Sequence, residues 1–125
     1  MSDNNGAERK LRYAVIGAGM AGVLAAIKLK ERGEEFTVYE KAARLGGTWR
    51  ENRYPGLTCD VPAHAYTYSF EPYPEWQAFY ADGAEIQTYF EKTADKYGVT
   101  PHIRFNSEVV SSEWDDARSV WKLGL

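Results

Sequence analysis

Three glycines near the N-terminus have the spacing of an anion-binding turn. The run Gly17-Ala-Gly-Met-Ala-Gly22 fits the pattern G-x-G-x-x-G. In this pattern the first glycine permits a tight turn, Gly19 lets a ligand approach the backbone, and Gly22 lets a helix pack closely against a strand. The first turn of that helix offers unpaired N–H groups and a partial positive charge. These residues therefore predict binding of a dinucleotide pyrophosphate.

One acidic residue follows at the distance that ribose recognition requires. Glu40 follows Gly22 by about the 20 residues that separate turn and acid in dinucleotide-binding units, where a carboxylate accepts hydrogen bonds from ribose hydroxyls. A carboxylate there should repel the 2′-phosphate of NADP, although the neighbouring cation Lys41 weakens that argument. FAD and NAD carry the same ADP half, so these residues leave the choice between them open. The plainer alternative is a glycine-rich turn followed by a solvated glutamate.

The glycine turn can act only if a strand precedes it and a helix follows it. Tyr13–Ile16 predicts a buried strand, Met20–Arg32 predicts a helix, and Phe36–Tyr39 predicts a second strand. Two strands around one helix within about thirty residues form a right-handed crossover unit. We therefore expect an α/β, Rossmann-like fold built on a β–α–β unit.

The rest of the chain predicts smaller elements around this unit. Residues 41–64 form a long loop broken by glycine and proline. The later elements are an aromatic strand, an amphipathic helix, a third strand and an appended β-hairpin, expected at Tyr66–Phe70, Ala84–Tyr97, Ile103–Phe105, and Glu108–Trp114 with Ser119–Leu123. The last strand has no partner after it, so we expect the fold to be incomplete at its C-terminus. Residues 1–10 are predicted to be a disordered leader.

The composition narrows the class of protein. The 125 residues carry a formal net charge of −3, and no basic stripe is present, which argues against a nucleic-acid partner. No apolar run reaches the length of a membrane span, and the polar N-terminus lacks the pattern of a signal peptide. Cys59 is the single cysteine, which is compatible with a reducing cytosol. We expect a cytoplasmic protein without a membrane or nucleic-acid partner.

The middle of the chain carries a more specific pattern. After the glycine turn, the blocks in order are Glu40, Gly46-Gly-Thr-Trp49, Asn52-Arg-Tyr-Pro-Gly56, Cys59-Asp60 and Tyr66-Thr-Tyr-Ser-Phe70. In order and spacing they resemble the N-terminal segment of class B flavoprotein monooxygenases, especially Baeyer–Villiger monooxygenases. The resemblance covers nearly everything from Leu11 to Leu125, which would make residues 11–125 the N-terminal part of an FAD-binding domain.

The resemblance implies roles for particular residues. FAD would be held by the β–α–β unit, and NADPH mainly by a second domain that is absent from this chain. The residues that would contact FAD are Gly17, Gly19, Gly22, Glu40, Gly47, Thr48, Trp49, Asp60, Tyr66 and, through its backbone, Val109. Of these, Asp60 would be the catalytic residue, beside the reacting face of the flavin. It would pair with an arginine beyond Leu125 and meet the nicotinamide.

Without the resemblance the same residues have plainer interpretations. The pair Gly46-Gly47 could lie against a ligand or another chain segment, or form a simple tight turn. Trp49 could pack in the core, and Asp60 could be a turn former. Cys59 has no base placed to activate it, so it is expected to be a small buried residue. The histidines lack metal-ligand spacing, so no metal site is expected.

For the complete enzyme the resemblance implies an NADPH- and O₂-dependent flavin monooxygenase. It would carry out Baeyer–Villiger oxidation of ketones through a flavin peroxide, which must be shielded from water. One alternative is oxygenation of an amine nitrogen or a sulfide sulfur, but the pairing of Arg53-Tyr-Pro-Gly56 with Cys59-Asp60 favours the ketone reaction. The other alternative is a non-catalytic nucleotide-binding role. The 125 residues alone are expected to be inactive.

Overall fold

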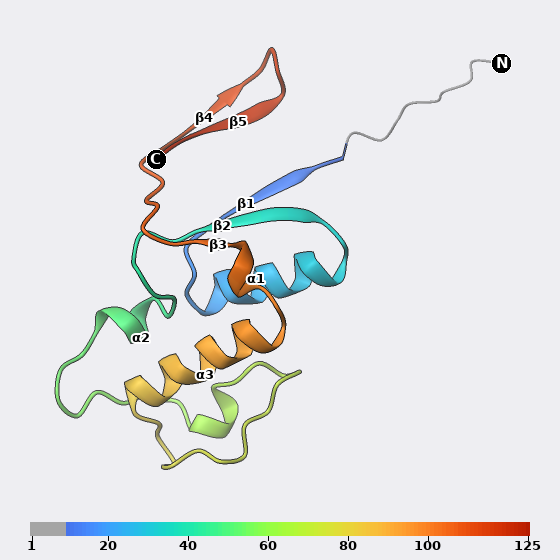
Figure 1. Ribbon diagram of the computed structural model, residues 1–125. Coiled ribbons are helices and arrows are strands. Elements are labelled where there is room, and N and C mark those ends of the chain that lie inside the picture. The colour runs from blue at the N-terminus through green and yellow to red at the C-terminus, as the bar shows by residue number, and fades with distance from the viewer. Residues whose placement is uncertain (1–9) are drawn as a thin grey trace.

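The computed structural model describes residues 10–125, so only Lys10 of the predicted leader lies within the described part. A parallel sheet with the strand order β1-β2-β3 forms its centre, and helix α1 connects β1 to β2 along one face (Figure 1). These elements span Arg12–Ile16 for β1, Met20–Glu31 for α1, Glu35–Tyr39 for β2 and Ile103–Arg104 for β3. The predicted β–α–β unit is confirmed, with bounds that shift by one residue. The prediction that its first strand is buried is wrong, because β1 lies at the edge of the sheet and Tyr13 and Ile16 are exposed.

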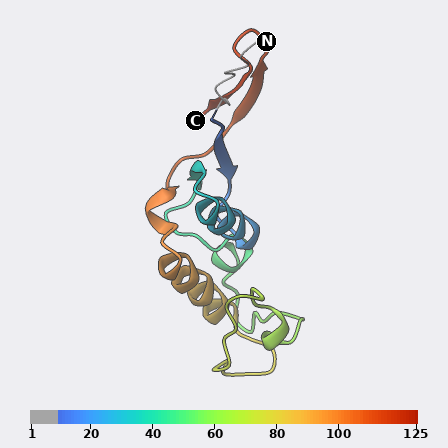
Figure 2. The ribbon, with the colours of Figure 1, turned by 90° about the vertical axis from the view of Figure 1, so that its right-hand side faces the viewer.

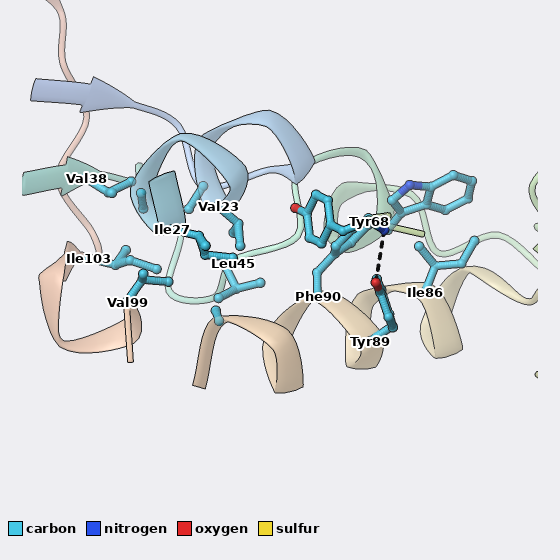
Figure 3. Close-up of a cluster of buried hydrophobic side chains, with 14 of the residues drawn as sticks. Val23, Ile27, Val38, Leu45, Tyr68, Ile86, Tyr89, Phe90, Val99 and Ile103 are labelled. Carbon is cyan, nitrogen blue, oxygen red and sulfur yellow. Dashed lines mark hydrogen bonds between the residues drawn. The ribbon is translucent and has the colours of Figure 1, made fainter. Parts of the chain in front are cut away.

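The side chains explain why this unit forms. On β2, Phe36 and Val38 alternate with more exposed neighbours and are buried, as expected for a strand with one face on a core. On α1, Val23 and Ile27 are buried and belong to the same apolar cluster (Figure 3). The helix ends before Gly33, whose φ of +70° is the left-handed conformation that terminates many helices.

Helix α3, Gly83–Lys96, forms a further layer, with α1 between it and the sheet (Figures 1 and 2). Its N-cap is Asp82, whose Oδ1 accepts a hydrogen bond from the N–H of Ala84 at 2.7 Å. Ile86 and Phe90 on this helix are fully buried in the shared core (Figure 3). The helix predicted over Ala84–Tyr97 is therefore confirmed to within one residue at each end.

The strand predicted over Tyr66–Phe70 is wrong. This segment follows a 3₁₀ helix, Ala63–Ala65, and consists of turns and bends. The N–H of Tyr68 donates to the hydroxyl of Tyr89 on α3 at 3.1 Å, as Figure 3 shows, and its ring stacks on Phe70 with centroids 5.3 Å apart. The alternating aromatic residues thus reflect packing against α3, because a side chain satisfies the backbone where a strand partner would have done so.

The predicted β-hairpin is present and projects from the body of the molecule (Figure 2). Its strands are β4, Ser111–Asp115, and β5, Val120–Gly124, which pair antiparallel. Trp114 lies opposite Trp121, with ring centroids 5.5 Å apart. The first strand begins at Ser111 instead of Glu108 because the preceding residues form the connection from β3.

Candidate functional site

The first glycine turn joins the end of β1 to the start of α1. Gly17 has φ +96°, a conformation that residues with a Cβ rarely adopt, and its N–H donates to the carbonyl of Tyr39 at 2.8 Å. Gly19 is the N-cap of α1, and no side chain accepts a hydrogen bond from the first-turn amides. Those amides have no partner within the helix, so they can bind an anion at this end of the sheet.

Gly22 is required by the turn itself. A Cβ at Gly22 would lie 1.9 Å from the carbonyl oxygen of Gly17, and 3.7 Å from Cγ1 of Val15 on β1. The sequence analysis assigned Gly22 to packing of the helix on the strand. The structure shows that the closest atom belongs to the turn, so a side chain at this position would displace the backbone of the turn.

The second glycine turn packs directly on the first. The N–H of Gly46 donates to the carbonyl of Ala18 at 2.9 Å. A Cβ on Gly47 would lie 3.2 Å from the Cα of Gly19, which is tighter than most van der Waals contacts, and Gly47 also has φ +54°. Of the interpretations left open for Gly46-Gly47, close approach to another chain segment is therefore the one that the structure shows.

Glu40 is a buried carboxylate that joins the turn to the chain after β2. It is only 5% exposed. Its Oε1 accepts from the N–H of Ala18 at 3.2 Å, and its Oε2 accepts from the N–H of Ala42 at 3.0 Å. Each carboxylate oxygen can accept more than one hydrogen bond, so capacity for a ribose hydroxyl remains. The neighbouring cation Lys41 pairs with Glu51, Nζ to Oε1 at 3.5 Å.

The chain that leaves β3 runs beside Glu40. The N–H of Glu40 donates to the carbonyl of Arg104 at 3.0 Å, and the N–H of Ser107 donates to the carbonyl of Glu40 at 2.9 Å. Val109 is half-buried and lies two residues further along this connection. The structure therefore places Val109 on the segment that leaves the Glu40 end of the sheet.

Helix α2, Thr48–Glu51, starts immediately after the second glycine turn. Thr48 is exposed and Trp49 is buried. The indole Nε1 of Trp49 donates to the hydroxyl of Tyr66 at 3.1 Å, and the two rings pack edge-to-face at 5.8 Å. Because the Tyr66 oxygen is the acceptor in this bond, its own proton is free for another partner. The structure thus brings Trp49 and Tyr66 together beside the second turn.

Asp60 lies in a more open region. Residues 57–63 pair with residues 79–83, through bonds from the N–H of Cys59 to Ala81 at 3.0 Å and from the N–H of Gly83 to Leu57 at 3.1 Å. Within residues 10–125, the exposed Asp60 carboxylate has no hydrogen bond or ion pair, and it does not join the glycine turns. Cys59 is buried and unpaired with another sulfur, as the sequence analysis predicted.

Two side chains that contact the region of the glycine turns were not singled out from the sequence. The hydroxyl of Tyr68 donates to the carbonyl of Met20, in the first turn of α1, at 2.5 Å. Burial, followed by the nearby Tyr89 and Tyr66, raises the pKa of Tyr68 well above its ordinary value. Gln87 is fully buried on α3 beneath the second glycine turn. Its position at the edge of the apolar stripe, next to Ile86 in the sequence, was the available signal, because a polar residue that is buried there must find partners inside the protein.

Comparison with known proteins places the chain in a family. Residues 15–82 match the family model described as NAD(P)-binding Rossmann-like domain. The chain is 43% identical to a Baeyer–Villiger monooxygenase of Streptomyces coelicolor over 98% of its own length. It is 46% identical to an FAD-binding monooxygenase of Aspergillus terreus over 94% of its length. The solved structure of an oxidized steroid monooxygenase bound to NADP is similar, with a TM-score of 0.84 and 36% identity over 90% of this chain.

The chain belongs to the NAD(P)-binding Rossmann-like domain family. The predicted α/β, Rossmann-like fold and the resemblance to Baeyer–Villiger monooxygenases are confirmed. The chain covers 24% of the Streptomyces protein, 22% of the Aspergillus protein and 23% of the steroid monooxygenase. The similarity therefore concerns one part of these longer proteins.

Two features are absent from residues 10–125. In this part of the chain, none of the helices has the length and apolar character needed to cross a membrane. The same residues contain no group of three or more His, Cys, Asp or Glu side chains arranged to bind a metal ion.

Proposed function

We propose that this chain is the FAD-binding portion of an NADPH- and O₂-dependent flavin monooxygenase that oxidises ketones by the Baeyer–Villiger reaction. The observation that carries the proposal is the contact between the two glycine turns at the N-terminus of α1, beside the buried Glu40. The similarity to a Baeyer–Villiger monooxygenase of Streptomyces coelicolor and to an FAD-binding monooxygenase of Aspergillus terreus supports it.

The residues present fit the cofactor. The first-turn amides of α1 are free of side-chain caps, which suits a pyrophosphate. Gly19 and Gly47 contact each other through backbone atoms, and neither residue has a side chain that could block a ligand at that point. Glu40 keeps acceptor capacity for the ribose hydroxyls of the ADP half. Val109, on the segment that leaves Glu40, is the residue proposed to contact adenine through its backbone.

The charges near Glu40 favour FAD over NADP at this turn. A 2′-phosphate would meet the carboxylate of Glu40, which is held in place by two backbone N–H groups. Lys41, the cation that could have offset this repulsion, lies 3.5 Å from Glu51 and is partly neutralised by it. We therefore assign the FAD site to this turn and propose that NADPH binds mainly through a domain outside this chain.

Each of several residues of this chain would have its own role at the site. Bound FAD would supply electron transfer to O₂ and oxygen transfer to the substrate. Thr48 would offer its hydroxyl to the ribityl–phosphate side. Trp49 would hold the hydroxyl of Tyr66, which keeps a proton to donate toward the flavin. Asp60, exposed and unpaired within residues 10–125, would present a negative charge to an arginine and to the nicotinamide.

The central test is the colour and turnover of the full-length parent protein. We expect it to purify yellow and to consume NADPH when a cyclic ketone is added, with formation of an ester or lactone as the product to be measured. A folded parent that stays colourless and cannot be reconstituted with FAD would overturn the proposal. Oxygenation of amines or sulfides with no ester formed from ketones would keep the cofactor assignment and reject the ketone reaction.

The 125-residue chain provides a second test. It should not turn over NADPH, because the domain proposed to hold NADPH and the arginine proposed to pair with Asp60 are not among its residues. The measurement is NADPH oxidation by the purified chain in the presence of FAD and a ketone, corrected for free FAD. Ester production by this chain would show that the proposed division between binding and reduction is wrong.

A further inference from the structure

Helix α3 contributes one buried amide to the loop that carries the second glycine turn. Gln87 is only 1% exposed, and a buried amide is costly unless both of its ends are hydrogen-bonded. Its Nε2 donates to the carbonyl of Leu45 at 3.0 Å, and its Oε1 accepts from Nη2 of Arg53. Both ends are therefore used, and both partners lie on the same loop.

The Leu45 end supports the glycine turn. A Cβ on Gly46 would lie 3.0 Å from Cγ of Gln87 and 3.2 Å from Cβ of Arg50, so the backbone of Gly46 rests directly on the glutamine side chain. The N–H of Gly46 in turn donates to the carbonyl of Ala18 at 2.9 Å. A continuous series of contacts therefore runs from α3 through the second glycine turn to the first.

The Arg53 end supports the exit from α2. Besides its bond to Gln87, Arg53 donates from Nε to the carbonyl of Arg50 at 3.2 Å. Residues 45 and 53 flank α2, Thr48–Glu51, which has only four residues. A helix this short has too few internal hydrogen bonds to be stable alone. Its position must come from contacts with the rest of the protein, and Gln87 bonds to residues on both sides of the helix.

We propose that Gln87 is a positioning residue for FAD, which fixes both ends of residues 45–53 and thereby places Gly47, Thr48 and Trp49 against the cofactor. This inference rests on the proposed function. It predicts that the two halves of FAD depend on Gln87 to different degrees. The ADP half is held by the first glycine turn and Glu40, whereas the flavin half depends on the loop that Gln87 holds.

The test compares FAD with ADP as ligands of the same chain. Gln87→Met keeps much of the side-chain size but removes both hydrogen bonds, and Gln87→Glu keeps the acceptor for Arg53 but loses the donor to Leu45. Gln77→Met, at an exposed glutamine, is the matched control. Dissociation constants are measured by calorimetry, with the visible spectrum of bound FAD and thermal unfolding recorded for each variant.

We expect Gln87→Met to weaken FAD binding about 10-fold, as loss of hydrogen bonds to buried groups does, and to change ADP binding by less than about 2-fold, because the ADP contacts lie elsewhere. Gln87→Glu should fall between the wild type and Gln87→Met, and its flavin spectrum should be closer to that of the wild type. Gln77→Met should match the wild type in every measurement.

Three results separate the possible failures. A wild-type chain that does not bind FAD contradicts the proposed function itself. A wild-type chain that binds FAD, together with a folded Gln87→Met variant that binds FAD equally well, overturns only this inference. Equal losses of FAD and ADP binding also overturn it, since they indicate general destabilisation. If Gln87→Met does not fold, the Arg53→Met variant provides the test, because it removes the bond between Arg53 and Gln87 without changing Gln87 itself. We expect it to lose FAD affinity and to keep its ADP affinity.

Discussion

The glycine-turn region and the Asp60 region are built in opposite ways. Around the glycine turns, backbone meets backbone: Gly46 bonds to Ala18, and Gly47 contacts Gly19. Asp60, by contrast, is an exposed side chain whose carboxylate has no hydrogen-bond or ion-pair partner within residues 10–125. A site made from backbone tolerates little change, because any added atom displaces the chain. A site made from exposed side chains can lose its chemistry without losing its fold.

The largest effect is expected for Gly22→Ala. The new Cβ would lie 1.9 Å from the carbonyl oxygen of Gly17, so the turn must open. Overpacking of this kind costs about 3 kcal/mol or more when the obstacle is backbone. Thermal or denaturant unfolding measures the loss, and FAD titration should show that binding is abolished. Ala21→Ser, one exposed position earlier, is the control and should behave like the wild type. A stable Gly22→Ala protein that still binds FAD would contradict the backbone-built site.

Glu40→Ala tests the one side chain on which the glycine-turn region depends. It removes the acceptors for the N–H groups of Ala18 and Ala42 and the proposed acceptors for ribose. Hydrogen bonds to charged groups are worth about 1.5–3 kcal/mol, so we expect FAD affinity to fall about 10- to 100-fold. Glu40→Gln, which keeps one acceptor oxygen, should lose less. Unchanged FAD retention in Glu40→Ala would place the ribose elsewhere.

Tyr68 joins the aromatic loop to the start of α1, and its effect should depend on pH. Tyr68→Phe removes the bond to the carbonyl of Met20 and should cost about 1 kcal/mol of unfolding free energy at neutral pH. Burial raises the pKa of Tyr68 in the folded protein, so the neutral form is favoured there. Above about pH 10 this tyrosine loses its proton in the unfolded protein but keeps it in the folded protein. The stabilisation that Tyr68 contributes to the folded state therefore decreases as pH rises beyond that point.

The measurement is denaturant unfolding of both proteins at pH 7 and above pH 10. The difference in unfolding free energy between the wild type and Tyr68→Phe should narrow at the higher pH, because only the wild type carries this ionisable group at position 68. A gap that stays constant or widens would show that the hydroxyl is not held neutral in the folded state. It would also mean that the contact with Met20 is weaker than its 2.5 Å distance indicates.

The smallest effect on the fold is expected for Asp60→Asn. The exposed carboxylate makes no hydrogen bond or ion pair within residues 10–125, so the free energy of unfolding should change by less than about 0.5 kcal/mol. FAD affinity should also stay within about 2-fold of the wild type. In the full-length parent, the rate of NADPH-dependent oxygenation should nevertheless fall at least about 10-fold if Asp60 has the proposed catalytic role. Full activity of this variant would show that Asp60 is not catalytic and has only the turn-forming role that is common for aspartate in such loops.

Local pattern was enough to predict most of the fold. The pattern of residue types predicted α1 from a run rich in Ala, Leu and Lys that ends before Gly33, and it predicted β2 from the short apolar run Phe36–Tyr39. It failed over Tyr66–Phe70, where the alternation was that of a strand. There the decisive partner was the hydroxyl of Tyr89 on α3, and no local pattern indicates which distant side chain will satisfy a given N–H group.

The candidate site was also only partly predictable from local sequence pattern. The sequence by itself determined the glycine spacing, the following helix and the acid at Glu40, because these features act within one β–α–β unit. Only the tertiary structure decided that Gly47 lies on Gly19, that Gln87 holds both ends of α2, and that Asp60 is exposed. These outcomes depend on which segments, distant along the chain, pack together, and close packing of the whole core settles that choice.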